Sequence, residues 1–174
     1  MDPSPPRRAL RPCDHRLVLH EGVTVGALQA VLTEHSAFTR AFDFQIQSIE
    51  PGACTLLVPF NPLFERPGGI LSGQVFMTAA DVAMWLAIKT KRGLHDTSVT
   101  VSMQTSFLRS GRREPITCTA RVLRLGARLC HGAAECFSPG GILLTHHSLT
   151  YMRPEPRSTN AHAGLPKAAV FPAP

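Results

Sequence analysis

The sequence contains no pair of cysteines at the spacing of a zinc or redox site. Its five cysteines include no C-x-x-C pair and their number is odd, so neither a zinc site nor a complete disulfide framework is indicated. Such cysteines are typical of reduced, buried thiols in a cytosolic protein. The eight histidines show no metal pattern either, because the adjacent His146 and His147 would face opposite sides of a strand. We therefore expect no metal and no other cofactor.

Dense runs of charge are also missing. The net charge is +6, but the basic residues are spread from Arg7 to Lys167, and few aromatic residues lie beside them. Nucleic-acid-binding proteins usually concentrate basic residues on one face. A solvated basic surface, or modest attraction to an anionic ligand, is the better interpretation. We expect no nucleic-acid partner.

The first residues, from Met1 to Arg8, lack the apolar run that a signal peptide needs. Residues 70–88 approach the length of a membrane span, yet Asp81 lies near their middle. A carboxylate at that depth in lipid would cost about 2.5–3.5 kcal/mol. We expect a helix buried inside a globular, cytoplasmic protein that has no membrane partner.

Proline marks both ends of the chain. Residues 1–20 are rich in proline and arginine, and residues 153–174 are rich in proline and alanine without any periodicity. Both compositions are typical of disordered segments. A single folded domain is predicted between them, over residues 21–152.

Hydrophobic periodicity predicts two helices and six strands in this domain. Thr24 can cap a first helix, and strands over residues 42–50 and 53–60 flank a Pro-Gly turn. A long apolar helix is predicted over residues 73–91. Four further strands follow, over residues 97–108, 116–125, 128–137 and 142–151. Turns as short as these require antiparallel strands. Because a helix that is apolar on every side needs cover all round, the sequence predicts an α+β fold with a curved antiparallel sheet wrapped around a long central helix.

Asp81 is the only charged residue between Gln74 and Ile88. Gln74, Thr78 and Asp81 have the i, i+4, i+7 spacing of one helix face, and apolar residues cover the other faces. Asp81 can cap a neighbouring loop or meet an arginine. A polar stripe nevertheless favours a wet cleft, since a buried carboxylate without partners is costly. Trp85, one turn further on, either lines such a pocket or packs in the core.

The segment before this helix is rich in glycine. Gly68, Gly69 and Gly73 let backbone N–H groups come close to a ligand, and a helix N-terminus adds partial positive charge. Such a place can stabilise an oxyanion, although a tight turn explains paired glycines equally well. Gly73 and Asp81 would lie roughly 10–12 Å apart along the helix, so a ligand that contacts both needs an elongated site.

Three stretches of the sequence resemble a known family. They are G-I-L-S-G-Q-V-F-M-T-A-A-D-V-A, V-T-V-S-M-Q-T-S-F-L-R-S and A-R-V-L-R-L-G-A-R. Together with the order of the elements, they resemble the hotdog-fold acyl-CoA thioesterases of the phenylacetate-pathway (PaaI-like) group, over roughly residues 40–152. The resemblance implies a hotdog fold and hydrolysis of an acyl-CoA thioester to the free acid and CoA. It also implies a homodimer, often paired into a homotetramer, with active sites between subunits.

The resemblance assigns roles to residues around the long helix. Asp81 falls on the family's acid, which serves as general base or nucleophile, and Gly73 falls on the glycine whose N–H polarises the thioester carbonyl. Thr100 falls where related enzymes carry a Ser or Thr of the partner subunit that orients the attacking water. Strict strand alternation, however, places Thr100 on the face opposite Met103.

The sequence departs from the family pattern at three positions. Ser72 stands in place of the usual histidine and can still donate a hydrogen bond. Gln74 replaces a second glycine. Arg66 replaces an asparagine, and it can pair with Asp81 or bind an anionic acyl group.

Substrate contacts are predicted for two groups of residues. The first group lies along the polar stripe and at its start: Arg66, Gln74, Thr78 and Trp85. The second group is basic and suits the phosphates of CoA, although each member is more often a solvated charge at a strand edge: Arg109, Arg124 and Arg128.

Two other functions are compatible with this reading of the sequence. A non-catalytic acyl-CoA-binding protein is the first, because the usual histidine is missing. Hydration or dehydration of acyl thioesters is the second, but such enzymes typically rely on a histidine near the start of the helix. No histidine occurs between His35 and His95, which argues against this activity.

Overall fold

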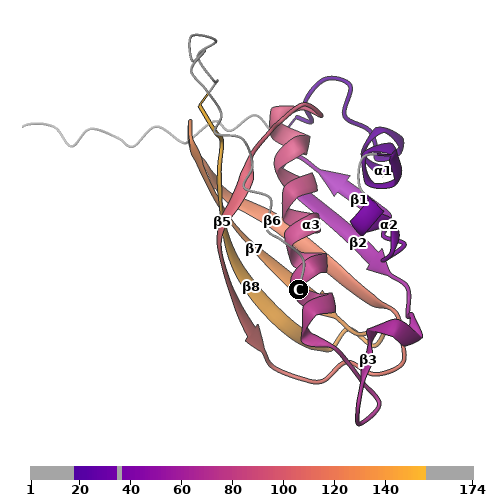
Figure 1. The fold of residues 1–174 in the computed structure, drawn as a ribbon. Coiled ribbons are helices and arrows are strands. Elements are labelled where there is room, and N and C mark those ends of the chain that lie inside the picture. The colour runs from indigo at the N-terminus through magenta and orange to yellow at the C-terminus, as the bar shows by residue number, and fades with distance from the viewer. Residues whose placement is uncertain (1–17, 35–36, 156–174) are drawn as a thin grey trace, which may run out of the picture.

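A long helix lies against the concave face of a six-stranded antiparallel sheet (Figure 1). The computed structural model describes residues 18–34 and 37–155. The elements follow in the order α1 (Val25–Glu34), α2 (Ala37–Arg40), β1 (Gln45–Glu50), β2 (Ala53–Val58), the 3₁₀ helix η1 (Pro62–Phe64), β3 (Glu65–Arg66), β4 (Ile70–Leu71), α3 (Gly73–Arg92), β5 (Val99–Phe107), β6 (Ile116–Leu125), β7 (Leu129–Phe137) and β8 (Leu143–Met152). The predicted α+β hotdog architecture, a long helix wrapped by a curved antiparallel sheet, is confirmed.

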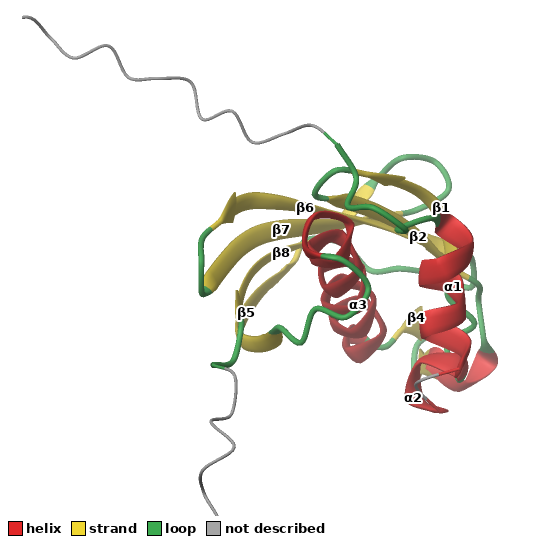
Figure 2. Cartoon of the chain, turned by 90° about the horizontal axis from the view of Figure 1, so that it is seen from above, coloured by secondary structure: helices red, strands yellow, loops and turns green. Residues whose placement is uncertain are grey.

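The strands of the main sheet have the spatial order β1-β2-β6-β7-β8-β5, and every neighbouring pair is antiparallel. The antiparallel directions agree with the short turns in the sequence. The order is not apparent from the sequence, because β5 does not pair with β6, the next strand along the chain. Instead, β5 lies at the edge of the sheet and pairs with β8. Figure 2 shows α3 against one face of this sheet, with α1 on the side of β1 and β2.

Helix α3 begins and ends close to the predicted limits. Ser72 is its N-cap, although its side chain makes no capping hydrogen bond. At the other end Gly93 adopts a φ of 91°, a value that L side chains rarely adopt, and its N–H donates to the carbonyl of Lys89. Basic residues in the last turn complement the negative end of the helix dipole. The helix is buried along most of its length, as its apolar sequence predicts.

Several predicted limits were wrong. Strand β1 begins at Gln45 rather than at Phe42, because Phe42 instead stacks on Phe44 and Phe64, with ring centroids 5.1 and 4.9 Å away. The short elements α2, η1, β3 and β4 were not predicted. At the N-terminal side, the backbone N–H of His20 donates to the carbonyl of Thr90, at 2.8 Å. The remainder of the two predicted disordered segments, residues 1–17 and 156–174, lies outside the described residues.

The four described cysteines and His147 are buried inside the protein. The cysteines are free and buried, as predicted for reduced thiols: Cys54, Cys118, Cys130 and Cys136. His147 is fully buried, with its two ring nitrogens 2.9 Å from the hydroxyl of Thr105 and 2.8 Å from that of Thr145. Over residues 18–34 and 37–155, no three His, Cys, Asp or Glu side chains are grouped so that they could hold a metal ion.

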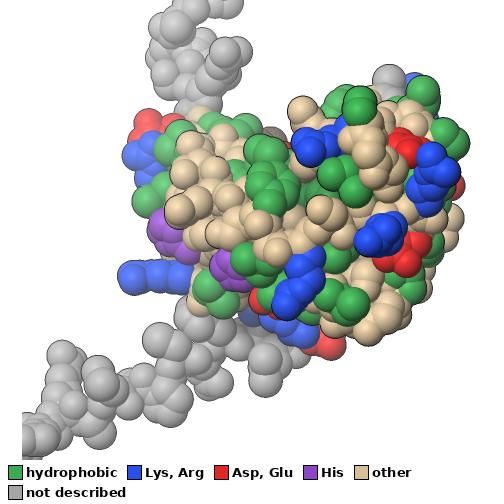
Figure 3. Space-filling view, turned by 90° about the horizontal axis from the view of Figure 1, so that it is seen from below, with side chains coloured by type: hydrophobic (Ala, Val, Ile, Leu, Met, Phe, Trp, Pro, Cys, Tyr) green, Lys and Arg blue, Asp and Glu red, His purple; other side chains and the backbone are tan. Residues whose placement is uncertain are grey.

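Charge on the surface is dispersed. On the face shown in Figure 3, acidic and basic side chains are interspersed rather than gathered in one patch. Within the described part of the chain, no helix combines the length and apolarity needed to cross a membrane.

Candidate active site

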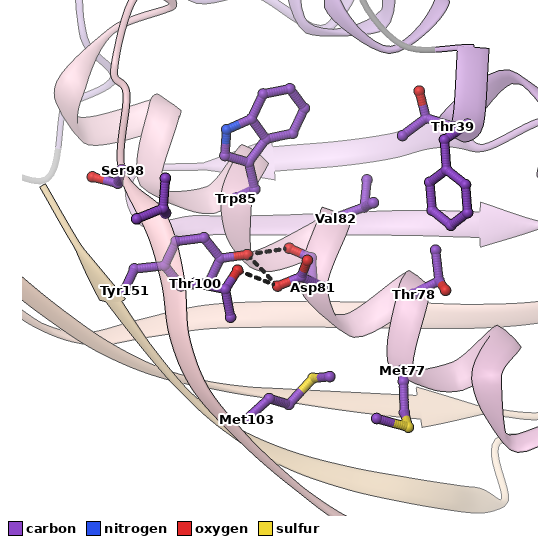
Figure 4. Close-up of a pocket in the computed structure, with 12 residues that line it drawn as sticks. Thr39, Met77, Thr78, Asp81, Val82, Trp85, Ser98, Thr100, Met103 and Tyr151 are labelled. Carbon is purple, nitrogen blue, oxygen red and sulfur yellow. Dashed lines mark hydrogen bonds between the residues drawn. The ribbon is translucent and has the colours of Figure 1, made fainter. Parts of the chain in front are cut away.

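Asp81 lies on the wall of a cavity of about 540 Å³ between α3, β5 and α2 (Figure 4). Polar groups cluster around its carboxylate, and apolar side chains make up much of the remaining wall. The lining residues are Phe38, Thr39, Met77, Thr78, Asp81, Val82, Trp85, Ser98, Val99, Thr100, Met103 and Tyr151. A cavity therefore lies beside Thr78 and Asp81 of the predicted polar stripe, whereas Gln74 does not line it.

Two hydroxyl groups hold one oxygen of the Asp81 carboxylate. The Thr100 hydroxyl donates to Asp81 Oδ1 at 2.7 Å, and the Tyr151 hydroxyl lies 2.6 Å from the same oxygen. The Tyr151 hydroxyl is also 2.7 Å from the backbone carbonyl of Asp81. Among the residues that the structure describes, none forms an ion pair with Asp81 or donates a hydrogen bond to its Oδ2. The second oxygen is thus left for a ligand or water.

A β-bulge explains how Thr100 reaches this position. The pairing between β5 and β8 shifts register between Thr100 and Ser102, so the strict alternation predicted for this strand is interrupted. Thr100 consequently lines the same cavity as Met103, and the prediction that they occupy opposite faces was wrong. Bulges often turn a side chain toward a functional site. The resemblance assigned Thr100 to a partner subunit, whereas its contact with Asp81 is made within one chain.

The pairing of strands also explains the position of Tyr151. Thr100 and Tyr151 are direct partners across β5 and β8, and side chains of such partners point to the same face of a sheet. Burial, and then the Asp81 carboxylate, raise the pKa of the Tyr151 phenol well above its usual range, so the hydroxyl keeps its proton. Sequence reasoning missed Tyr151, because its closeness to Asp81 depends on the non-local pairing of β5 with β8.

Gly73 lies in a different cavity. This second cavity, of about 400 Å³, is lined by Arg66, Ile70, Leu71, Gly73, Phe76, Phe107, Leu108, Arg109, Ser110 and Gly111. A Cβ at Gly73 would come within 3.1 Å of the Phe107 ring, so the backbone here approaches a neighbouring side chain closely. Gly73 and Asp81 therefore do not share a cavity within one chain.

Comparison with known proteins identifies the family. The model of the thioesterase superfamily matches residues 68–145. A protein of Saccharolobus solfataricus, named for an inferred esterase activity, is 30% identical over 107 residues, which are 62% of this chain and 70% of the relative. The chain belongs to the thioesterase superfamily.

Solved structures of the superfamily share the fold. A thioesterase from Haemophilus influenzae matches with a TM-score of 0.71 and 18% identity, over 78% of this chain and 94% of the other. The PaaI protein from the phenylacetic acid degradation operon of E. coli matches with a TM-score of 0.68 and 17% identity, over 76% and 96%. The likeness of the fold to this group is confirmed, and membership of the thioesterase superfamily supports thioester hydrolysis in general.

The cavity beside Asp81 brings together four of the predicted site residues: Thr78, Asp81, Trp85 and Thr100. Trp85 is half-buried, and the structure shows both of its predicted roles, because it lines the cavity and also packs against the hydrophobic core. The ammonium group of Lys89 lies 4.7 Å from the centre of its ring. Lys89 in turn donates to the carbonyls of Leu94, at 2.7 Å, and Asp96, at 2.9 Å.

The other predicted site residues lie outside this cavity. Ser72 and Gln74 hydrogen-bond to each other through their side chains, before and in the first turn of α3. Arg66 and Arg109 line the second cavity, so within the described residues Arg66 does not pair with Asp81. The last two arginines line neither cavity: Arg124 is exposed on β6, and Arg128 forms an ion pair of 2.8 Å with Glu155.

Proposed function

We propose that the protein is an acyl-CoA thioesterase in which the Asp81 carboxylate either attacks the thioester carbonyl carbon or deprotonates a water molecule. One observation carries the proposal: a carboxylate is anchored through one oxygen by Thr100 and Tyr151, while no described residue bonds its other oxygen at the cavity. A carboxylate held in this way has a fixed direction and an available lone pair. Membership of the thioesterase superfamily supports the type of bond that is cleaved.

The reaction follows from the position of this oxygen. Asp81 Oδ2 accepts a proton from water, whose oxygen then bonds to the thioester carbonyl carbon. When the tetrahedral intermediate collapses, the C–S bond breaks, and CoA leaves as a thiolate that takes up the proton. Alternatively, Oδ2 attacks the carbonyl carbon directly, the C–S bond breaks, and CoA leaves as a thiolate. Water then hydrolyses the resulting anhydride to the free acid and Asp81, and one of the water's protons goes to the thiolate. A single turnover in ¹⁸O-labelled water distinguishes the two routes, since only the anhydride route can introduce the label into Asp81.

The oxyanion requires a donor that a single chain does not bring to Asp81. Gly73 begins α3, where free backbone N–H groups and the helix dipole favour negative charge. Along the helix it lies about 12 Å from Asp81, and it faces the second cavity. We propose that the partner subunit's Gly73 supplies this N–H, so that the active unit is a homodimer, and a tetramer is a pair of such dimers.

The acyl group would lie in the cavity beside Asp81. Met77, Val82 and Trp85 offer apolar contacts there, and Thr78 offers a hydroxyl. The phosphates of CoA would remain outside, and Arg66 and Arg109, which line the second cavity, are the cationic partners that we propose for them. We also propose a cytoplasmic location, which the free, buried cysteines support.

Release of free CoA tests the activity. Acetyl-, hexanoyl-, palmitoyl- and phenylacetyl-CoA represent short, medium, long and aromatic acyl groups in a thiol-release assay. Asp81→Asn should leave the protein folded, by circular dichroism, and lower turnover of the best substrate by about 10²-fold or more. Asp43→Asn removes an exposed carboxylate that does not line the cavity, and it should leave turnover unchanged. Equal rates for wild type and Asp81→Asn would rule out the assignment of Asp81.

A non-catalytic acyl-CoA-binding protein is the second candidate. It is favoured by Ser72, which replaces the family's histidine and whose side chain is bonded to that of Gln74. Binding of these acyl-CoAs without release of thiol would support it. A hydratase or dehydratase is disfavoured because, among the residues that the structure describes, no histidine lines the cavity beside Asp81 or the one beside Gly73.

A further inference from the structure

Tyr151 is the one residue of the Asp81 cluster to which neither the sequence pattern nor the family resemblance gives a role. It lies on β8 with only 2% of its surface exposed, so its ring belongs to the core. Only its hydroxyl reaches the polar part of the cavity, where it is within hydrogen-bonding distance of two atoms of Asp81. A phenylalanine would fill the same space in the core. The hydroxyl is therefore a separable feature.

The single proton of this hydroxyl has two acceptors within reach. The backbone carbonyl of Asp81 lies inside α3, where carbonyl groups accept from the N–H four residues later, here that of Trp85. Asp81 Oδ1 carries negative charge, and hydrogen bonds to charged acceptors are the stronger ones. The proton is therefore best used by Oδ1, at 2.6 Å.

Thr100 donates to the same oxygen from the neighbouring strand. Its hydroxyl also has one proton, and at 2.7 Å from Oδ1 that proton is engaged. Toward a water molecule in the cavity, Thr100 can then only accept. Both donors thus act on Oδ1, and they approach from β5 and β8, which are paired with each other.

We propose that Tyr151 is a positioning residue for thioester hydrolysis, which together with Thr100 clamps Oδ1 of Asp81 and so makes Oδ2 the reacting oxygen. The inference rests on the proposed function. Without the clamp, the carboxylate of Asp81 can rotate about its side-chain bonds to orientations in which neither oxygen points at the bound thioester. The productive orientation is then populated for only part of the time.

Few other ionisable groups face this carboxylate. From α2 the lining residues Phe38 and Thr39 are uncharged, and so are Ser98, just before β5, and Thr100 and Met103 on β5. Tyr151 itself comes from β8, and from β7 the thiol of Cys130 lies near Tyr151, with a pKa raised by burial to about 11. On α3 the nearest described cation is Lys89, two turns beyond Asp81 and bonded to carbonyl groups. Among the described lining residues, no other charged side chain therefore competes with the two hydroxyls for the Asp81 carboxylate.

The Tyr151→Phe variant tests the clamp, with the acyl-CoA that the wild type hydrolyses fastest as the probe. We expect kcat to fall about 10-fold to 100-fold, as for loss of a hydrogen bond to a charged group, with KM changed by less than about 2-fold. Thr100→Val should show the same fall in kcat with little change in KM, from the other strand. The double variant should lose less than the product of the two single losses, since both hydroxyls act on one oxygen.

A matched control removes a hydroxyl elsewhere in the same sheet. Thr55 bonds to Thr119 across β2 and β6, at 3.0 Å, and lines neither cavity. Thr55→Val should leave kcat and KM unchanged. A wild-type kcat in Tyr151→Phe, or a change in KM alone, would overturn the inference. If Asp81→Asn is inactive while Tyr151→Phe behaves as the wild type, only the positioning role fails; if Asp81→Asn is fully active, the proposed function itself fails.

Discussion

At the scale of single residues, hydrogen bonds fix the orientation of the Asp81 carboxylate, and burial controls the ionisation of thiol groups in the core. Burial raises the pKa of the Cys54 thiol from 9.0 to about 12. Between these values the unfolded chain loses the thiol proton while the native protein keeps it. The contribution of Cys54 to stability is therefore complete below pH 9 and is lost as the pH rises toward 12.

This difference in the pKa of Cys54 between the unfolded and native states predicts a loss of stability with rising pH that Cys54→Ala removes. In urea unfolding, the wild type should lose about 1–2 kcal/mol more stability than Cys54→Ala between pH 8 and pH 10.5. Alanine also leaves a small cavity, but that cost is the same at both pH values and cancels in the comparison. Equal losses for the two proteins would show that Cys54 ionises in the native state as it does in the unfolded chain.

At the scale of elements, the C-terminus of α3 depends on a single glycine. Gly93 has a φ of 91°, and a Cβ there would lie 2.9 Å from the His20 ring. Gly93→Ala should therefore lower the free energy of unfolding by more than about 1 kcal/mol. Gly26, inside α1, has no positive φ and no contact closer than 4.0 Å, so Gly26→Ala should raise it by about 0.5–1 kcal/mol. Thermal melts of both variants check the opposite signs.

The same scale shows where sequence reasoning succeeded and where it could not. The limits of α3 could be predicted because the signals that determine them are local: the apolar periodicity lies within the helix, and the Gly93 cap lies next to it. The predicted range of residues 73–91 agrees with the observed helix within about one turn at each end. Asp81 was identified for the same reason. The cavity contact of Thr100 depends on a bulge, and that of Tyr151 depends on β5 lying beside β8. Both are non-local, so a strand pattern taken one segment at a time predicts neither.

At the scale of the whole molecule, β5 pairs with β8 on one side only, and no described strand pairs with its other side. It is an edge strand of the sheet, and Val99, Val101 and Phe107 on it are exposed apolar residues. Exposed edges of this kind are ready to pair with another chain. Because β5 also carries Thr100 and borders both cavities, a second copy paired there would lie next to Asp81 and Gly73.

A lysine introduced on this edge should show whether turnover depends on dimerisation. Val101 is 50% exposed and lines neither cavity, so Val101→Lys should convert a dimer into a monomer in light scattering, because lysine on an edge strand opposes pairing. Turnover should fall with it, since Gly73 and Asp81 lie in different cavities of one chain. Leu123→Lys places the same charge on β6, inside the sheet, at a position 72% exposed, and it should change neither property. A monomeric Val101→Lys with wild-type turnover would show that one chain supplies its own oxyanion donor, and a dimeric one would place the interface elsewhere.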